Sequence, residues 1–343
     1  MLRLPTTSRV LPLLLATLAL GCSPAQPAGT TSAHDPVDLT SSPATSAARP
    51  RQRSFGFTYA GAVSQLKPGA KARIWLPLAQ SNSWQQVTVS KIELPAPHQQ
   101  TTEPDYGNQI LFFEATADEQ GEIPFAITYQ IVRSEVTPRN VDLVKEPARF
   151  LQADQYVPID KQLLDAVFAG KKKPTGTTQE QARQLYEAIL DRMKYDKPAG
   201  GQWGRGDAEW ACNSRFGNCT DFHSLFMSLC RELKIPAMFE IGFPLPAEDT
   251  SGTVAGYHCW AFFGDERWQP VDISEADKHP EMKAYYFSNL TADRVTFSTG
   301  RDITLVPPQD GEPLNYFVYP YVEIDGRPAA KEQIEPEFAY HDR

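Results

Sequence analysis

The segment 219–233 constrains the fold of this chain more than any other part of its sequence. Its large apolar residues recur at intervals of three and four, which places them on one face of an amphipathic helix: Phe222, Leu225, Phe226, Leu229 and Leu233. Asn218 is a good N-cap residue for this helix, and Pro236 ends it. A helix with such a continuous apolar face has to be buried against other elements.

Strands are predicted directly after this helix, at 237–243 and 256–263, with a turn at 264–266 and a returning strand at 267–273. Two helices are predicted before it. The first covers 160–169. The second runs from 178 to about 194 and opens with a capping box of Thr178 and Gln181.

An earlier region, 53–140, has a different pattern. Short runs of β-branched and aromatic residues alternate with turn residues, for example around Phe55, Phe57 and Tyr59. Several short strands at this spacing predict a small antiparallel β-sandwich. The fold class expected for the whole chain is therefore α+β, with a β-sandwich preceding a mixed core.

The N-terminus resembles an export signal. Arg3 and Arg9 precede an apolar run that is too short to span a bilayer, and Gly21-Cys22 follows at once. This pattern is similar to a bacterial lipobox, which implies cleavage of the signal peptide directly before Cys22 and lipidation of Cys22 as the mature N-terminus. The alternative is a plain secretory signal. Residues 23–52 are rich in Ser, Thr, Ala and Pro, so we predict a flexible tether.

Cys219 is the first candidate for chemistry. It lies in the first turn of the predicted helix, where the helix dipole favours a thiolate and backbone N–H groups can hold an oxyanion. The alternative is a small buried apolar side chain, which is the interpretation we give to Cys230.

His258 and Asp272 are the second candidates. If the turn pairs Phe263 with Arg267, His258 lies directly opposite Asp272, with Cβ atoms about 4.5–5.5 Å apart. A carboxylate at that place could orient the imidazole while the other ring nitrogen reaches a thiol. A slip of one residue would put the two side chains on opposite faces. His223, one helical turn after Cys219, is an alternative base or a residue lining the pocket.

Three ordered motifs resemble the transglutaminase-like family: the Cys-containing segment 217–226, the Tyr-His-Cys-Trp segment 257–260 and the Trp-x-x-x-Asp segment 268–272. The resemblance covers roughly residues 178–275. It implies a papain-like α+β core in which Cys219 attacks an amide carbonyl, His258 relays protons and Asp272 orients His258. The sequence has no calcium-loop pattern, and no cofactor is expected.

The remaining candidate contacts to substrate or oxyanion are less specific. They are Trp203, Trp210, Asn218, His223, Tyr257 and Trp260. Four charged residues could instead read a polar substrate or form ion pairs: Arg205, Asp207, Arg294 and Arg301. The resulting domain prediction is a signal peptide at 1–22, a linker at 23–52, a sandwich at 53–140, a catalytic domain at 141–300 and a C-terminal extension packed on the core at 301–343.

Other arrangements of the cysteines stay open. A zinc site from Cys212, Cys219, His223 and His258 lacks the usual spacing, so no metal is expected. A disulfide joining Cys212 to Cys230 or Cys259 is compatible with export.

The functional expectation is an exported, lipid-tethered thiol enzyme that acts on peptide or isopeptide bonds, by hydrolysis rather than cross-linking. Its partners would be a peptide or protein substrate and, through the lipid alone, a membrane. The net charge of −9 argues against nucleic acid. The alternative is a non-catalytic scaffold or recognition lipoprotein with the same fold. The sequence does not indicate an oligomeric state.

Overall fold

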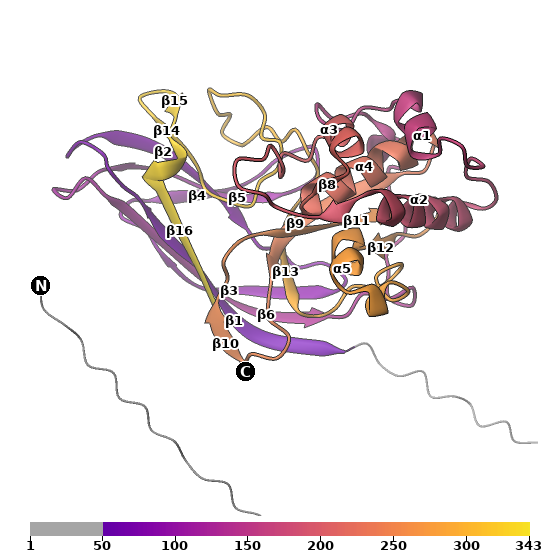
Figure 1. The fold of residues 1–343 in the computed structure, drawn as a ribbon. Helices are drawn as coiled ribbons and strands as arrows, with labels where there is room; N and C mark the ends of the chain where they lie inside the picture. Colours follow the sequence, from indigo (N-terminus) through magenta and orange to yellow (C-terminus); the bar gives the residue numbers. More distant parts are fainter. Residues whose placement is uncertain (1–50) are drawn as a thin grey trace, which may run out of the picture. The chain divides into compact units, whose positions relative to one another are not determined.

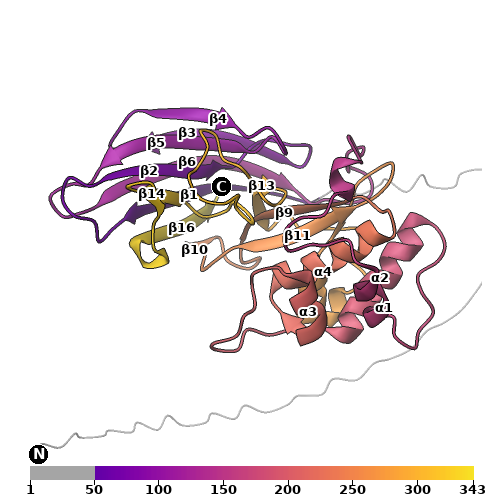
Figure 2. The same cartoon turned by 90° about the horizontal axis from the view of Figure 1, so that it is seen from above.

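The computed structural model describes residues 51–343, and most strands of this part form three sheets (Figures 1 and 2). The predicted cleavage and lipidation at Cys22 lie outside the described residues. The first sheet has the order β10 (Ser251–Thr253), β16 (Ile334–Asp342), β1 (Gln52–Val63), β6 (Ile123–Ser134), β3 (Gln85–Glu93). The second has the order β15 (Arg327–Pro328), β14 (Tyr321–Ile324), β2 (Lys71–Leu78), β5 (Gln109–Thr116), β4 (His98–Thr102).

The third sheet has the order β12 (Gln269–Val271), β11 (His258–Phe263), β9 (Ala237–Pro244), β13 (Arg294–Thr299). A short parallel pair joins β7 (Lys194–Tyr195) to β8 (Phe216–Gly217). The helices lie mainly together beside the third sheet in Figure 2: α1 (Lys161–Val167), α2 (Thr178–Arg192), α3 (Ala208–Ser214), α4 (Cys219–Glu232) and α5 (Ile273–Lys278). Single 3₁₀ turns occur at Arg149–Leu151, Pro280–Met282 and Lys331–Gln333. No helix among residues 51–343 is long and apolar enough to cross a membrane.

The two ends of the described chain build the first two sheets together. β16 pairs with β1 along its whole length, and β14 pairs with β2. The sequence did not predict these pairings, because the C-terminal strands lie in a segment rich in aromatic and turn residues. The mixed α+β class and the antiparallel β-region are confirmed.

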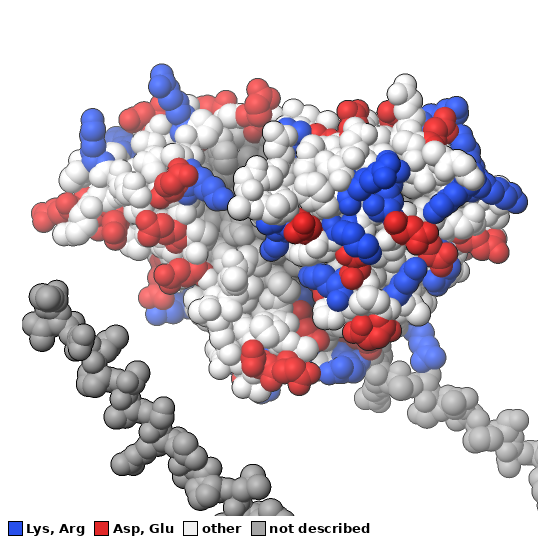
Figure 3. Space-filling view, in the orientation of Figure 1, with Lys and Arg blue, Asp and Glu red and all other residues white. Residues whose placement is uncertain are grey.

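Aromatic packing joins the first sheet to the third. The rings of Phe243 on β9 and Phe338 on β16 have centroids 4.1 Å apart, and Phe57 on β1 lies 5.7 Å from Phe297 on β13. These residues belong to one large buried cluster that continues to the helices. The sheets that hold the site are therefore supported by the β-sandwich. Outside this core, Lys, Arg, Asp and Glu side chains are interspersed on the face shown in Figure 3.

Local sequence signals predicted α1, α2 and α4, but not the short helices α3 and α5. Asn218 caps α4 and exchanges hydrogen bonds with Asp221 in a capping box. The box of α2 was placed one residue too late, since Thr177 and Glu180 form it in place of Thr178 and Gln181. Glu180 bonds the backbone of Thr177 through a carboxylate, which makes the stronger, charge-assisted pair.

The predicted register of the hairpin is wrong by two residues. Phe263 pairs with Gln269, and Ala261 pairs with Val271. The turn is longer than expected because its last residues pair elsewhere: the Trp268 N–H donates to the carbonyl of Asp142 over 2.9 Å. A slip of two residues keeps every side chain on its predicted face, so His258 and Asp272 still meet.

Position 242 requires glycine, because β9 lies between β11 and β13 with no room for a side chain there. It pairs with His258 on β11 and with Thr296 on β13, and a Cβ added to it would lie 1.8 Å from the carbonyl oxygen of Val295. We expect Gly242→Ala to lower the free energy of unfolding by about 2–4 kcal/mol, because backbone cannot move aside cheaply. Denaturant unfolding measures this. Gly252→Ala is the matched control, since its nearest contact would be 3.6 Å away. Equal stabilities for the two variants would contradict the prediction.

Candidate active site

Cys219 is the first residue of α4 and is almost covered, with 2% of its surface exposed. The Asn218 side chain accepts a hydrogen bond from the Thr220 N–H over 3.0 Å. The Cys219 N–H, one residue earlier, belongs to the first-turn groups that have no acceptor within the helix. The sulfur therefore lies at the positive end of the α4 dipole, beside a backbone donor.

The segment around Gly204 is held against the start of α4. Asp221 accepts hydrogen bonds from the N–H groups of Gly204 (2.7 Å), Gly206 (3.0 Å) and Asn218 (3.0 Å). Burial nevertheless raises the pKa of Asp221 to about 6. The hydroxyls of Thr220, Tyr257 and Tyr316 all donate to the Gly204 carbonyl. These contacts form one wall beside the thiol.

His258 and Asp272 come together at the other side of the sulfur. His258 begins β11, and Asp272 follows β12 as the N-cap of α5. The His258 Nε2 lies 2.8 Å from Asp272 Oδ2. Asp272 Oδ1 accepts from the Glu275 N–H and from the Ser274 hydroxyl, both at 3.1 Å. With Nε2 engaged by Asp272, the Nδ1 of His258 is left for the sulfur.

Charges in this group reinforce one another. Burial disfavours the thiolate, but hydrogen bonds from Cys259 and His258 outweigh it and hold the pKa of the Cys219 thiol well below its usual value. Burial also works against the imidazolium, yet the Asp272 carboxylate and the Cys219 sulfur raise the pKa of His258 to about 10. The arrangement favours a thiolate–imidazolium pair.

His223 does not compete as the base. Its Nε2 accepts the Ile273 N–H over 3.0 Å, so the proton sits on Nδ1, which donates to the Cys219 carbonyl over 2.7 Å. Both ring nitrogens are thus occupied, and burial lowers the pKa of His223. His223 ties the first turn of α4 to the first residue of α5.

The other predicted contacts are used structurally. The Trp203 indole N–H donates to the Pro198 carbonyl, and the Trp260 indole N–H donates to Glu240. Trp210 packs edge-on against Phe216 with ring centroids 5.4 Å apart. The Asn218 amide donates to the Tyr257 hydroxyl over 3.0 Å, so Tyr257 lies beside the helix start.

The four charged candidates also form contacts within the protein. Arg301 is buried and bonds to Ser224, Gly206 and Asn315, which corrects its proposed role in reading a substrate. Arg294 is buried against Asp272, as described below. Arg205 pairs with Asp207 near the surface.

The cysteines are all free thiols in the described part: Cys212, Cys219, Cys230 and Cys259. The disulfides considered from the sequence are therefore not formed. Among residues 51–343, the four side chains considered as a zinc site do not converge within ligand distance of one another.

Two neighbours of the site were not singled out as functional by the sequence. The Cys259 sulfur lies 3.6 Å from His223 Nδ1 and helps to lower the pKa of the Cys219 thiol, and a Glu275 carboxylate oxygen lies 3.7 Å from His258 Nε2. Cys259 directly follows His258 in the chain, and Glu275 is an acidic residue in the first turn of α5. The only sequence signal for Cys259 and Glu275 was that each lies close in the chain to a candidate residue.

Comparisons with known proteins bear on the fold of this part of the chain. Residues 161–273 match the family model described as the transglutaminase-like superfamily. An uncharacterized protein of Haemophilus influenzae is 25% identical over 307 residues, which are 75% of this chain and 82% of that protein.

The fold is also similar to solved structures. A candidate cysteine protease from Cytophaga hutchinsonii has a TM-score of 0.52 at 14% identity, covering 86% of this chain and 99% of its own. The periplasmic domain of TgpA from Pseudomonas aeruginosa has a TM-score of 0.33 at 14% identity, covering 68% of this chain and 93% of its own.

Proposed function

We propose that this protein is a thiol enzyme that cleaves or transfers acyl groups at peptide or isopeptide amide bonds, with Cys219 as nucleophile, His258 as proton relay and Asp272 as its orienting acid. The observation that carries the proposal is the meeting of these three side chains at a helix start, with His258 Nε2 2.8 Å from Asp272 and with His258 near enough to lower the pKa of the Cys219 thiol. A nucleophile, a base and an orienting group in this relation define acyl-transfer chemistry.

In the first half of the reaction, the Cys219 thiolate attacks the amide carbonyl carbon. The electron pair moves to the carbonyl oxygen, where the Cys219 N–H at the start of α4 can donate to it. His258 then gives its Nδ1 proton to the leaving amine nitrogen as the C–N bond breaks. A thioester on Cys219 and a free amine result.

In the second half, neutral His258 removes a proton from the attacking water at Nδ1. The hydroxyl adds to the thioester carbonyl, the C–S bond breaks, and a carboxylic acid leaves. An amine in place of water would give cross-linking. The near-complete cover over Cys219 supports water as acceptor, because a small molecule reaches a closed site more easily than a lysine side chain.

The cellular setting is also part of the proposal. The signal-like N-terminus and Cys22 support export and a lipid anchor at the cell envelope, on the periplasmic face of the outer membrane if the cell is Gram-negative. The acidic net charge of −9 supports a peptide or protein substrate rather than nucleic acid.

A second candidate function is a non-catalytic scaffold or recognition protein. The exposure of only 2% for Cys219 favours it, because a substrate could not reach the sulfur without movement of the surrounding wall.

Alkylation of Cys219 separates the two functions. In a variant with Cys22, Cys212 and Cys230 replaced by Ala, we expect peptide mapping to show that iodoacetamide labels Cys219 faster at neutral pH than it labels free cysteine. His258→Ala should slow this labelling by about tenfold or more, because the imidazolium that stabilises the thiolate is gone.

His279→Ala is the matched control, since His279 is exposed and lies outside the group. Labelling no faster than that of free cysteine would favour the scaffold. Mass spectrometry of a peptide incubated with and without an added amine then identifies the acceptor, and exclusive formation of amine adducts would contradict hydrolysis.

A further inference from the structure

Arg294, the first residue of β13, contacts Asp272, the acid of the candidate triad. Its side chain is buried, and Nη1 donates to Asp272 Oδ2 over 2.9 Å. His258 Nε2 contacts that same oxygen at 2.8 Å. One carboxylate oxygen is thus shared between the candidate proton relay and a permanent cation.

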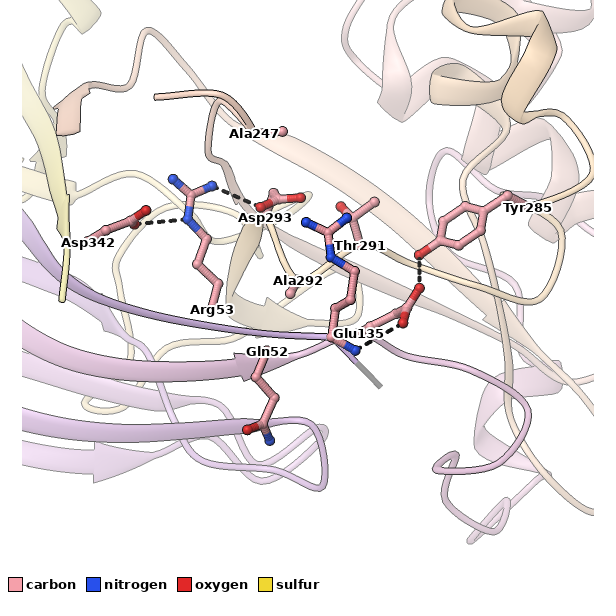
Figure 4. A pocket seen from close by; sticks show the side chains of 10 residues that line it. Gln52, Arg53, Glu135, Ala247, Tyr285, Thr291, Ala292, Asp293 and Asp342 are labelled. Carbon is pink, nitrogen blue, oxygen red and sulfur yellow. Dashed lines mark hydrogen bonds and ion pairs between the residues drawn. The ribbon is translucent and has the colours of Figure 1, made fainter. Parts of the chain in front are cut away.

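Packing holds the guanidinium in place. It lies over the Trp260 ring, 4.8 Å from the centroid, and the Trp260 N–H is itself bonded to Glu240 over 2.8 Å. The residue before it, Asp293, forms a 2.9 Å ion pair with Arg53 of β1 at the edge of the cavity in Figure 4. The first strand of the sandwich therefore anchors the end of β13 that carries Arg294.

Cys219 and His258 lose their charges during the proposed reaction. Arg294 keeps its positive charge throughout. Before attack, a thiolate, an imidazolium, a carboxylate and a guanidinium balance. Once His258 has given up its proton, Asp272 would be a buried anion beside a neutral ring. The guanidinium keeps that carboxylate paired in both states, which a buried charge requires.

The contact of Arg294 with Asp272 Oδ2 also weakens the attraction between Asp272 and the protonated His258 ring. A carboxylate that accepts from a second cation at the same oxygen has less negative potential to offer an imidazolium. A ring bound too strongly as imidazolium is a poor acid toward a leaving amine.

We propose that Arg294 is a positioning residue that acts through Asp272: it fixes the carboxylate and limits the basicity of His258, so that the ring can release its proton. This inference rests on the proposed function. The titratable and charged groups around the His258–Asp272 pair are Cys219 and His223 on α4, Glu275 in the first turn of α5 and Arg294 on β13, while Cys259 acts on the Cys219 thiol.

The test is a nuclear magnetic resonance titration of the His258 ring in full-length protein with Cys219→Ala, which removes catalysis from the measurement. Arg294→Gln should raise the pKa of His258 by at least about half a unit, since the neighbouring cation is lost and Oδ2 is freed. Arg294→Lys keeps the positive charge and should therefore shift the pKa of His258 less. Adding Asp272→Asn should remove most of the effect, because Arg294 acts through that carboxylate.

Arg133→Gln is the matched control. Arg133 is also buried and lies 5.9 Å from the Trp260 ring, but it bonds to Thr296 and Gln85 rather than to Asp272. A His258 shift in Arg294→Gln no larger than in Arg133→Gln, or an equal shift with and without Asp272→Asn, would overturn the proposal. If Arg294→Gln does not fold, Arg294→Met, which also removes the charge, takes its place, and a His258 pKa no higher than in Arg133→Gln rejects a positioning role. Slow labelling of Cys219 in the otherwise unchanged protein would instead count against the proposed function and leave this titration valid.

Discussion

Asp272→Ala is expected to lower the free energy of unfolding by about 3–5 kcal/mol, the range found when one partner of a buried ion pair is removed. Asp272 has three roles at once: it accepts from His258, it pairs with Arg294, and it caps α5 through Oδ1. Alanine removes the cap and leaves the guanidinium buried without its carboxylate. Denaturant unfolding at neutral pH measures the loss.

Asp272→Asn separates stability from reactivity. Asparagine keeps an oxygen that can cap α5, so the variant should be more stable than Asp272→Ala. It cannot stabilise the imidazolium as a carboxylate does, so Cys219 labelling should still fall by about tenfold or more. Asp272→Ala combined with Arg294→Met should recover part of the lost stability, because both buried charges are then gone. Equal stability of Asp272→Ala and the unchanged protein would reject this account of the site.

Cys219 is expected to be ionised at neutral pH, where only a few per cent of a free cysteine is thiolate. The thiolate fraction should thus exceed that of free cysteine by roughly thirtyfold. The difference in ultraviolet thiolate absorbance between the protein and Cys219→Ala measures it. Cys230, on the same helix, provides an internal comparison, since burial raises the pKa of its thiol.

The pH dependence of the thiolate–imidazolium pair follows from the pKa shifts of Cys219 and His258. The Cys219 pKa is lowered in the folded protein, so the thiolate is lost only as the pH falls through that lowered value. The His258 pKa is raised, so the imidazolium is lost as the pH rises through about 10. The ion pair, and the stability it contributes, should persist between these limits. A thiolate that forms only above pH 8 would contradict the prediction.

Features encoded by local sequence were predictable. The apolar spacing in 219–233 and the cap at Asn218 gave α4, because both depend on residues within one or two turns. The meeting of His258 with Asp272 was predictable because the alternation of a strand fixes the face of each side chain even when the register slips by two. The length of the turn between them was not, because it depends on the pairing of Trp268 with Asp142, far away in the chain.

Features that depend on distant segments were missed. Arg294 was noted only as a charge near a possible cleft. Its contact with Asp272 requires β13 to lie beside β9, and nothing local to Arg294 specifies that neighbour. The same holds for β14 and β16, whose partners are β2 and β1, more than two hundred residues earlier in the chain.

The position of β16 between β1 and β10 has a consequence for how the molecule is made. β1 is synthesised more than two hundred residues before β16, which is one of its two neighbours in the sheet. Until β16 is made, β1 has an unpaired edge, which can pair wrongly with other chains. The sandwich that supports Arg294 can close only after β16 has been synthesised, so deletion of residues 334–342 should be as damaging to the distant thiol as a substitution beside it.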